Sequence, residues 1–208
     1  MGRRASEIAR RWVVLTLLAG ACARPAAVPP PAPPPAPRPE LEAPLPCQRI
    51  VAIHVSKRDR RLRAHCEGGA VVELPVALGR ETDGPKTGSG DSRTPEGRYQ
   101  ISGTPQASRF HLFVPIDYPS IADAEIARNE GRLSEDEYHR IVDAHAQGRQ
   151  PPADTALGGH LGFHGEGRRW RGDSRYLDWT YGCIALSDAD LDFVAARSAI
   201  GTPVWIEP

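Results

Sequence analysis

The most informative stretch of the sequence is Asp178-Trp179-Thr180-Tyr181-Gly182-Cys183-Ile184-Ala185-Leu186, which follows Phe163-His164-Gly165 across a polar, glycine-bearing loop. A free cysteine has a pKa of about 8.5, so its thiol needs help to act as a nucleophile at neutral pH. A neighbouring imidazole or a helix N-terminus supplies that help. We expect both here, because the loop can bring His164 against Cys183 and a helix is predicted just after Ser187.

This pattern indicates a nucleophilic cysteine with a histidine base. Gly182 would let a substrate carbonyl approach the backbone, where amides near Cys183 could form an oxyanion hole. The alternative for Cys183 is a small buried hydrophobic side chain, which is the usual role of a free cysteine. One cysteine and one histidine alone do not show whether Cys183 is catalytic or structural. The surrounding sequence must decide between these two roles.

A metal site is a further alternative, because His160 and His164 are four residues apart and Cys183 could complete a ligand set. On a helix this spacing would place both imidazoles on one face. The glycines within residues 158–162 disfavour a helix, and on a strand residues four apart lie about 13 Å from each other. We therefore predict no metal, and we interpret His160 as a neighbour on the substrate-facing side of the site.

Residues 47–208 predict a mainly β domain. Strand-like runs cover residues 50–55, 61–65, 70–78, 98–102, 110–116, 158–164 and 202–206. Residues 121–147 instead have helical spacing, with a break near Gly131 and a second helix start at Ser134. This segment predicts a solvated two-helix insertion, with a lid over a substrate groove as the alternative. A last helix is expected over about 188–197, capped by Ser187.

The first 46 residues have the features of targeting and linker segments. Residues 1–21 combine a basic start with an apolar run at 12–18, which is shorter than the roughly 20 residues that span a bilayer. Leu18-Ala19-Gly20-Ala21-Cys22 resembles a bacterial lipoprotein cleavage site, with Cys22 as the lipidated residue. Ordinary signal cleavage nearby, which would release a soluble secreted protein, is the alternative. Residues 22–46, rich in Pro and Ala, predict a semi-rigid tether.

Charge and cysteine content add two constraints. The chain has 26 basic and 26 acidic residues, so its composition gives no electrostatic case for a nucleic-acid partner. Of the four cysteines, Cys22 is accounted for by lipidation and Cys183 by catalysis. Cys47 and Cys66 then remain on either side of a predicted hairpin, and we expect a disulfide between them in an oxidising compartment. Pairing with Cys183, or two free thiols, would explain their placement less well.

Together and in this order, several segments resemble the L,D-transpeptidase catalytic-domain family, also called YkuD-like. They are the opening hairpin, residues 76–79 (Val-Ala-Leu-Gly), residues 90–97 (Gly-Asp-Ser-Arg-Thr-Pro-Glu-Gly), His164-Gly165, and residues 180–184. The resemblance spans about residues 49–208. It implies a β-sandwich or barrel with a helical insertion and a helix after the catalytic cysteine, and it implies no cofactor.

In that family, the cysteine attacks the carbonyl at the L-centre of the third stem residue of peptidoglycan and expels a terminal D-alanine. The acyl group then passes to an amine of a neighbouring stem peptide or a wall-linked protein, or to water. By resemblance, Cys183 is the nucleophile, His164 is the base and later acid, and the Gly165 carbonyl orients the imidazole. The amides of Cys183, Gly182 and Tyr181 would form the oxyanion hole, with Thr180 and His160 in the substrate site.

The sequence departs from the family pattern at two positions beside the cysteine. Ile184-Ala185 lacks the arginine that many members carry there, and Tyr181 replaces a second histidine. This Gly-Cys-Ile-Ala variant resembles a sub-branch that includes enzymes cutting wall linkages, so a carboxypeptidase or amidase is an alternative to transfer. Arg168, Arg169 and Arg171 could bind a substrate carboxylate, or could form a solvated cluster.

The expected location is the periplasmic side of the cell envelope, with the protein held at the membrane by a lipid or else secreted. A non-catalytic wall-binding lipoprotein of the same fold is a further alternative. The combination of Cys183, His164 and Gly182 argues against it, because binding alone requires no thiol.

Overall fold

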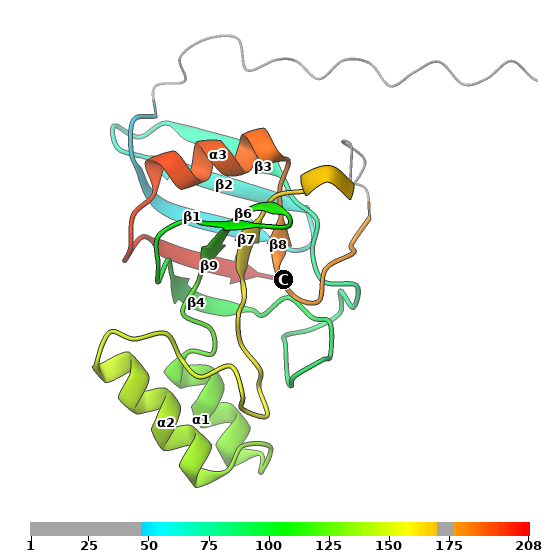
Figure 1. The fold of residues 1–208 in the computed structure, drawn as a ribbon, viewed down its shortest axis with the longest axis vertical. Coiled ribbons are helices and arrows are strands. Elements are labelled where there is room, and N and C mark those ends of the chain that lie inside the picture. The colour runs from blue at the N-terminus through cyan, green and yellow to red at the C-terminus, as the bar shows by residue number, and fades with distance from the viewer. Residues whose placement is uncertain (1–46, 170–176) are drawn as a thin grey trace, which may run out of the picture. The chain divides into compact units, whose positions relative to one another are not determined.

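The computed structural model describes residues 47–169 and 177–208, which contain two mixed β-sheets and three α-helices (Figure 1). The predicted signal segment, Cys22, the tether and Arg171 lie outside the described residues. Within the described ranges, every helix is too short or too polar to cross a membrane.

The first sheet has five strands in the order β3-β2-β1-β9-β4. They are β1 (Ile50–Ser56), β2 (Arg61–Cys66), β3 (Val71–Pro75), β4 (Gly97–Gln100) and β9 (Pro203–Glu207). β1 to β3 form the antiparallel meander expected from their alternation, with Ile53 and Leu62 buried on one face. The C-terminal strand β9 lies inside the sheet, parallel to β1 and antiparallel to β4.

The second sheet has the order β5-β6-β7-β8. Its strands are β5 (Gln106–Ser108), β6 (His111–Pro115), β7 (Gly162–His164) and β8 (Ile184–Ala185). β7 and β8 run parallel, with His164 opposite Ala185. The predicted base is therefore the last residue of β7, and the predicted nucleophile is the residue just before β8.

Two predicted strands are shorter than expected. The strand expected over residues 70–78 ends at Pro75. Beyond it, Ala77 and Gly79 form isolated bridges to Ala185 and Thr180 instead of continuing the pairing with β2. The run at 158–164 is a strand only from Gly162, since Gly158 and His160 have φ angles of 74° and 55°. These left-handed φ angles interrupt the extended backbone before Gly162, so His160 is not on the strand where the sequence places it.

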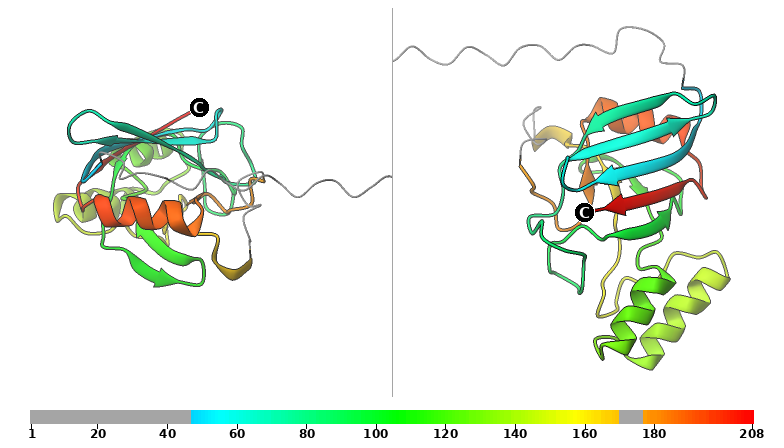
Figure 2. Two further views of the ribbon diagram at one scale, coloured as in Figure 1. Left: turned by 90° about the horizontal axis from the view of Figure 1, so that it is seen from above. Right: turned by 180° about the vertical axis from the view of Figure 1, so that it is seen from behind.

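The second sheet and α3 (Asp188–Arg197) lie on the same face of the five-stranded sheet (Figures 1 and 2). α3 packs beside β6 and β7, and its buried residues Leu191 and Val194 join a core that also contains Phe163. Ser187 caps this helix by accepting a hydrogen bond from the Asp190 amide, as predicted. Neither of the described sheets closes on itself, so the fold is an open two-sheet arrangement rather than a barrel.

The helical insertion is confirmed as two helices, α1 (Ile121–Asn129) and α2 (Glu135–Ala146), separated near Gly131. Each begins with a capping box, in which Ser120 or Ser134 bonds reciprocally with the acidic residue three positions later. Arg132 donates to the Thr87 carbonyl, and Ser89 donates to Ala156 beyond the insertion. The insertion and the segment that follows it therefore contact the loop at 86–94, which supports the cysteine as described below.

Cys47 and Cys66 form a disulfide, the pairing expected from the sequence. The Arg197 guanidinium donates to the Cys47 carbonyl at 2.9 Å and so ties the start of the domain to α3.

Replacing Cys47 and Cys66 together with serine should lower the free energy of unfolding by about 3 kcal/mol, since the bond closes a loop of 19 residues in the unfolded chain. Urea denaturation under non-reducing conditions measures this change. Cys183→Ser is the matched control and should have a much smaller effect. An unchanged urea midpoint in the double variant would contradict the expectation.

Candidate active site

His164, at the end of β7, is fixed by three contacts. Its Nδ1 lies 2.8 Å from the Gly165 carbonyl oxygen, its ring stacks on Phe110 with centroids 4.9 Å apart, and Trp179 meets it edge-on at 5.2 Å. A carbonyl can only accept a hydrogen bond, so Nδ1 carries the proton and Nε2 is left with its lone pair. The imidazole is therefore oriented and in the correct tautomer to act as a base through Nε2.

The turn after His164 is held by the first residue of α3. One carboxylate oxygen of Asp188 accepts hydrogen bonds from the amides of Glu166 and Gly167, at 2.8 and 2.9 Å. The same oxygen would lie 2.3 Å from a Cβ added at Gly165. Gly165 is thus required for close packing, which keeps its carbonyl in place against the imidazole.

The segment before Cys183 is fastened to residues 77–80. The Thr180 amide donates to the Leu78 carbonyl, and the Leu78 amide donates to the Asp178 carboxylate, at 3.1 and 2.9 Å. The Thr180 hydroxyl donates to the Cys183 carbonyl at 2.7 Å and accepts from the Gly182 amide at 3.1 Å. Thr180 therefore uses its hydroxyl to fix the turn around the cysteine, and it also lines the cavity, where a substrate contact stays a prediction.

Gly182 is held tightly at the centre of this turn. Its φ of 126° is unfavourable for other residues, and an added Cβ would lie 2.6 Å from the Arg93 carbonyl oxygen. Because the Gly182 amide already donates to Thr180, only the amides of Cys183 and Tyr181 stay candidates for an oxyanion hole among the three that the sequence predicted.

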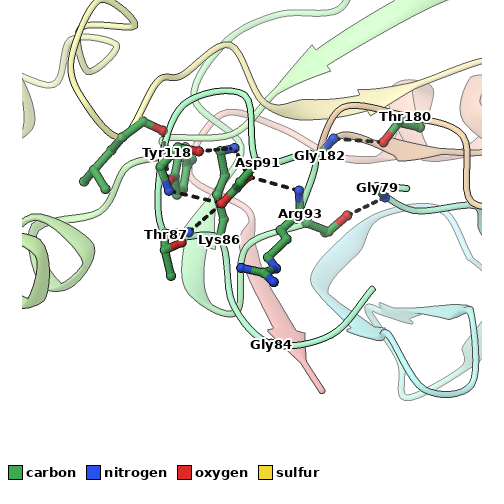
Figure 3. A network of polar contacts seen from close by, with 12 residues as sticks. Gly79, Gly84, Lys86, Thr87, Asp91, Arg93, Tyr118, Thr180 and Gly182 are labelled. Carbon is green, nitrogen blue, oxygen red and sulfur yellow. Dashed lines mark hydrogen bonds and ion pairs between the residues drawn. The ribbon is translucent and has the colours of Figure 1, made fainter. Parts of the chain in front are cut away.

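The 90–97 motif lies against this turn, and Figure 3 shows Asp91 and Arg93 near Thr180 and Gly182. The Asp91 carboxylate accepts from the Lys86 ammonium at 2.6 Å and from the amides of Thr87 and Arg93. Burial alone would raise the pKa of the Asp91 carboxyl, but these hydrogen bonds together outweigh it and hold the pKa below its usual value. The motif is therefore a scaffold for the active-site turn.

Cys183 and His164 line one open cavity of about 1060 Å³. The same cavity is lined by Phe110, Trp179, Tyr181 and His111, and by three arginines, Arg80, Arg109 and Arg168. Of the predicted arginines, Arg168 is at the cavity, whereas for Arg169 only the backbone, in the short 3-10 helix η1 (Gly167–Arg169), is described. Three residues near the site, Arg80, Arg109 and Lys86, were not predicted from the sequence. Among them only Arg80 had a nearby signal, since it directly follows the 76–79 marker.

His160 is placed differently from its expected position. Its side chain is exposed and is not among the residues that line the cavity, and only its carbonyl oxygen approaches Cys183 Sγ, at 3.7 Å. The described residues contain no group of three or more His, Cys, Asp or Glu side chains arranged to hold a metal ion.

Burial favours the neutral forms of both Cys183 and His164. Burial raises the pKa of the Cys183 thiol to about 11, although a Gly162 backbone hydrogen bond and the Lys86 charge oppose it. Burial also lowers the pKa of His164 below its ordinary value; the Gly165 hydrogen bond opposes this and the Arg109 charge adds to it. This pair suits transfer of the thiol proton to the imidazole as the sulfur attacks, rather than a preformed ion pair.

Comparison with known proteins gives one family model, that of the L,D-transpeptidase catalytic domain, which matches residues 50–206. Among solved structures, the Bdellovibrio bacteriovorus protein Bd1075 is 19% identical with a TM-score of 0.45, the alignment covering 76% of this chain and 48% of that one. L,D-transpeptidase 1 of Mycobacterium tuberculosis is 12% identical with a TM-score of 0.39, covering 76% and 60%. An Enterococcus faecium L,D-transpeptidase is 13% identical with a TM-score of 0.44, covering 76% and 50%.

The chain thus spans only about half to three fifths of the length of these solved proteins. Comparison with curated protein sequences gives no match.

Replacing Gly182 with alanine should displace the cysteine turn, because the new Cβ would meet the Arg93 carbonyl oxygen at 2.6 Å. We expect alkylation of Cys183 by iodoacetamide to become at least about tenfold faster, because the displaced thiol would lose the burial that raises its pKa to about 11 and would return towards the ordinary value of about 8.5. Gly69→Ala is the matched control, since Gly69 also has a positive φ but nothing within 4 Å of an added Cβ. Equal alkylation rates in the two variants would contradict this account.

The thiol of Cys183 should titrate with a midpoint near 11. Ultraviolet absorbance of the thiolate measures this, and subtracting the titration of a Cys183→Ala variant isolates the signal. A midpoint clearly below the ordinary value of about 8.5 would instead indicate a thiolate–imidazolium pair.

Proposed function

The chain belongs to the L,D-transpeptidase catalytic-domain family, and we propose that it is a cysteine-dependent acyltransferase that acts on peptidoglycan stem peptides in cell-wall remodelling. The observation that carries this proposal is that Cys183 lines the same open cavity as His164, whose Nδ1 is occupied by the Gly165 carbonyl. A binding protein would need neither the thiol nor the fixed tautomer.

In the first half-reaction, His164 Nε2 takes the thiol proton while Cys183 Sγ attacks the carbonyl at the L-centre of the third stem residue. The carbonyl oxygen becomes an oxyanion, which the amides of Cys183 and Tyr181 stabilise. The intermediate then collapses, and the bond to the terminal D-alanine nitrogen breaks. The imidazolium returns its proton to that leaving amine, and a thioester remains on Cys183.

In the second half-reaction, an acceptor amine attacks the thioester carbonyl and His164 takes a proton from its nitrogen. Collapse of this second intermediate forms the new amide and releases the cysteine sulfur, which regains the proton. The acceptor is the side-chain amine of another stem peptide or of a wall-linked protein. The cavity of about 1060 Å³ is open enough for a second peptide chain to approach.

Hydrolysis is the second candidate, in which water replaces the acceptor amine. It is favoured by Ala185, which stands where many family members carry an arginine. Ala185 is 1% exposed and is bonded through both its amide and its carbonyl to Ala77, so this position is packed into the fold and does not reach the cavity. A site without that arginine has lost one means of holding a peptide, and water could then compete with the amine.

We place the enzyme at the periplasmic side of the cell envelope, with Cys22 as the lipid-bearing residue and residues 22–46 as a tether to the wall. Detection of an unmodified N-terminus on the mature protein would exclude the lipid.

The test is incubation of the purified protein and its Cys183→Ala variant with disaccharide-tetrapeptide muropeptides, followed by mass spectrometry of the products. Cysteine-dependent dimers would establish transpeptidation. Cysteine-dependent shortening without dimers would establish the hydrolase. Identical products from the two proteins would contradict both candidates.

Catalysis should also decline at acid pH. Because the pKa of His164 lies below the ordinary value of about 6.5, the rate should fall through a midpoint below 6.5 as the imidazole becomes protonated and can no longer accept the thiol proton. The pH profile of kcat/KM measures this midpoint. A midpoint above 6.5 would contradict the assigned environment of the base.

A further inference from the structure

The cavity beside Cys183 is rich in arginines that form no ion pair within the described part of the chain. Arg80, Arg109 and Arg168 all line it, and none of the three is paired with a carboxylate among residues 47–169 and 177–208. The acidic residue in the same wall is Asp188, whose carboxylate already accepts two backbone amides. The cavity is therefore built for an anion.

Arg80 lies on the cysteine side of the cavity. Its guanidinium carbon is 4.5 Å from the centre of the Tyr181 ring, and its Nε and Nη1 donate to the Trp179 carbonyl and the Tyr181 hydroxyl, each at 3.3 Å. These contacts hold the guanidinium next to the turn that carries Cys183. They use only part of its five N–H donors, so the remainder can bind a ligand.

Arg109 lies on the histidine side of the cavity. Its guanidinium carbon is 4.7 Å from the centre of the Phe110 ring, and the other neighbour of that ring is His164, at 4.9 Å. The charge of Arg109 reaches the base, since it contributes to lowering the pKa of His164. An arginine stacked on an aromatic ring is partly preorganised, so it loses less side-chain freedom when it binds a carboxylate.

We propose that Arg80 and Arg109 form two carboxylate-binding subsites on either side of the Cys183–His164 pair, so that the enzyme selects peptides with a carboxylate near each side of the bond that is cut. This proposal rests on the proposed function for the identity of its substrate. A stem peptide supplies such groups as the carboxylate of the terminal D-alanine and the second carboxylate of diaminopimelate. The guanidinium groups of Arg80 and Arg109 also supply positive charge to the site. Many family members have such a charge from an arginine at the position of Ala185.

The subsites can be tested without any enzymatic turnover. Iodoacetate and iodoacetamide alkylate the same thiol, but only iodoacetate carries a carboxylate. We expect the ratio of their rates at Cys183 to fall about fivefold in Arg80→Gln and in Arg109→Gln, the effect of one charge at close range in water, with the iodoacetamide rate little changed. Peptide mass spectrometry of the full-length protein reports alkylation at Cys183 alone.

Arg98→Gln is the matched control, because Arg98 is an exposed residue of β4 that does not line the cavity. Its rate ratio should equal that of the unmodified protein. The proposal is overturned if the ratio is unchanged in the two cavity variants, or if Arg98→Gln lowers it equally.

Turnover then tests the identity of the anion. With muropeptides whose diaminopimelate carboxylate is free or amidated, the unmodified protein should prefer the free form through a lower KM. One of the two arginine variants should lose that preference while kcat changes less.

If no muropeptide reacts but the alkylation ratios change as expected, the proposed function fails and the anion subsites stand. Retention of the full preference by both variants would overturn the assignment of diaminopimelate.

Discussion

The active site depends on a backbone pairing between two segments that are about a hundred residues apart in the sequence. Ala77 and Ala185 exchange hydrogen bonds at 2.9 and 2.8 Å, and the Thr180 amide donates to Leu78 at 3.1 Å. Buried backbone groups must find partners, so this pairing leaves little freedom in the position of Cys183. The parallel register of β7 and β8 places His164 opposite Ala185, and His164 and Cys183 both line the cavity. The Asp91 network and the disulfide stabilise the parts of the fold on which these segments rest.

The sequence predicted those features that depend on local chemistry. The meander β1–β3 follows from alternation, the insertion and its break follow from helical spacing and Gly131, and the helix after the cysteine follows from the Ser187 cap. Features that depend on distant contacts were not predictable. β5 and β8 have three and two residues, too few for any period to appear. The Gly182 amide was assigned to the oxyanion hole because nothing in the sequence indicates that the Thr180 hydroxyl would bind it.

The site combines a neutral pair, Cys183 and His164, with a charged rim formed by Arg80, Arg109 and Arg168. Burial disfavours both the thiolate and the imidazolium, so the thiol of the protein without substrate stays protonated. The arginines around the cavity lie closer to solvent, where they can attract an anionic peptide at little cost of desolvation. In this account the substrate's charge is recognised by the rim, while proton transfer within the Cys183–His164 pair drives the chemistry.

The most direct test of the central claim is detection of the covalent intermediate. After a short reaction with a tetrapeptide muropeptide, quenched in acid, intact-mass and peptide mass spectrometry would be applied to the protein and to its His164→Ala variant. The account predicts a thioester on Cys183 with the mass of the muropeptide minus D-alanine, formed far more slowly in the variant. No adduct on Cys183 in a sample that is turning over substrate, or an adduct on another residue, would contradict it.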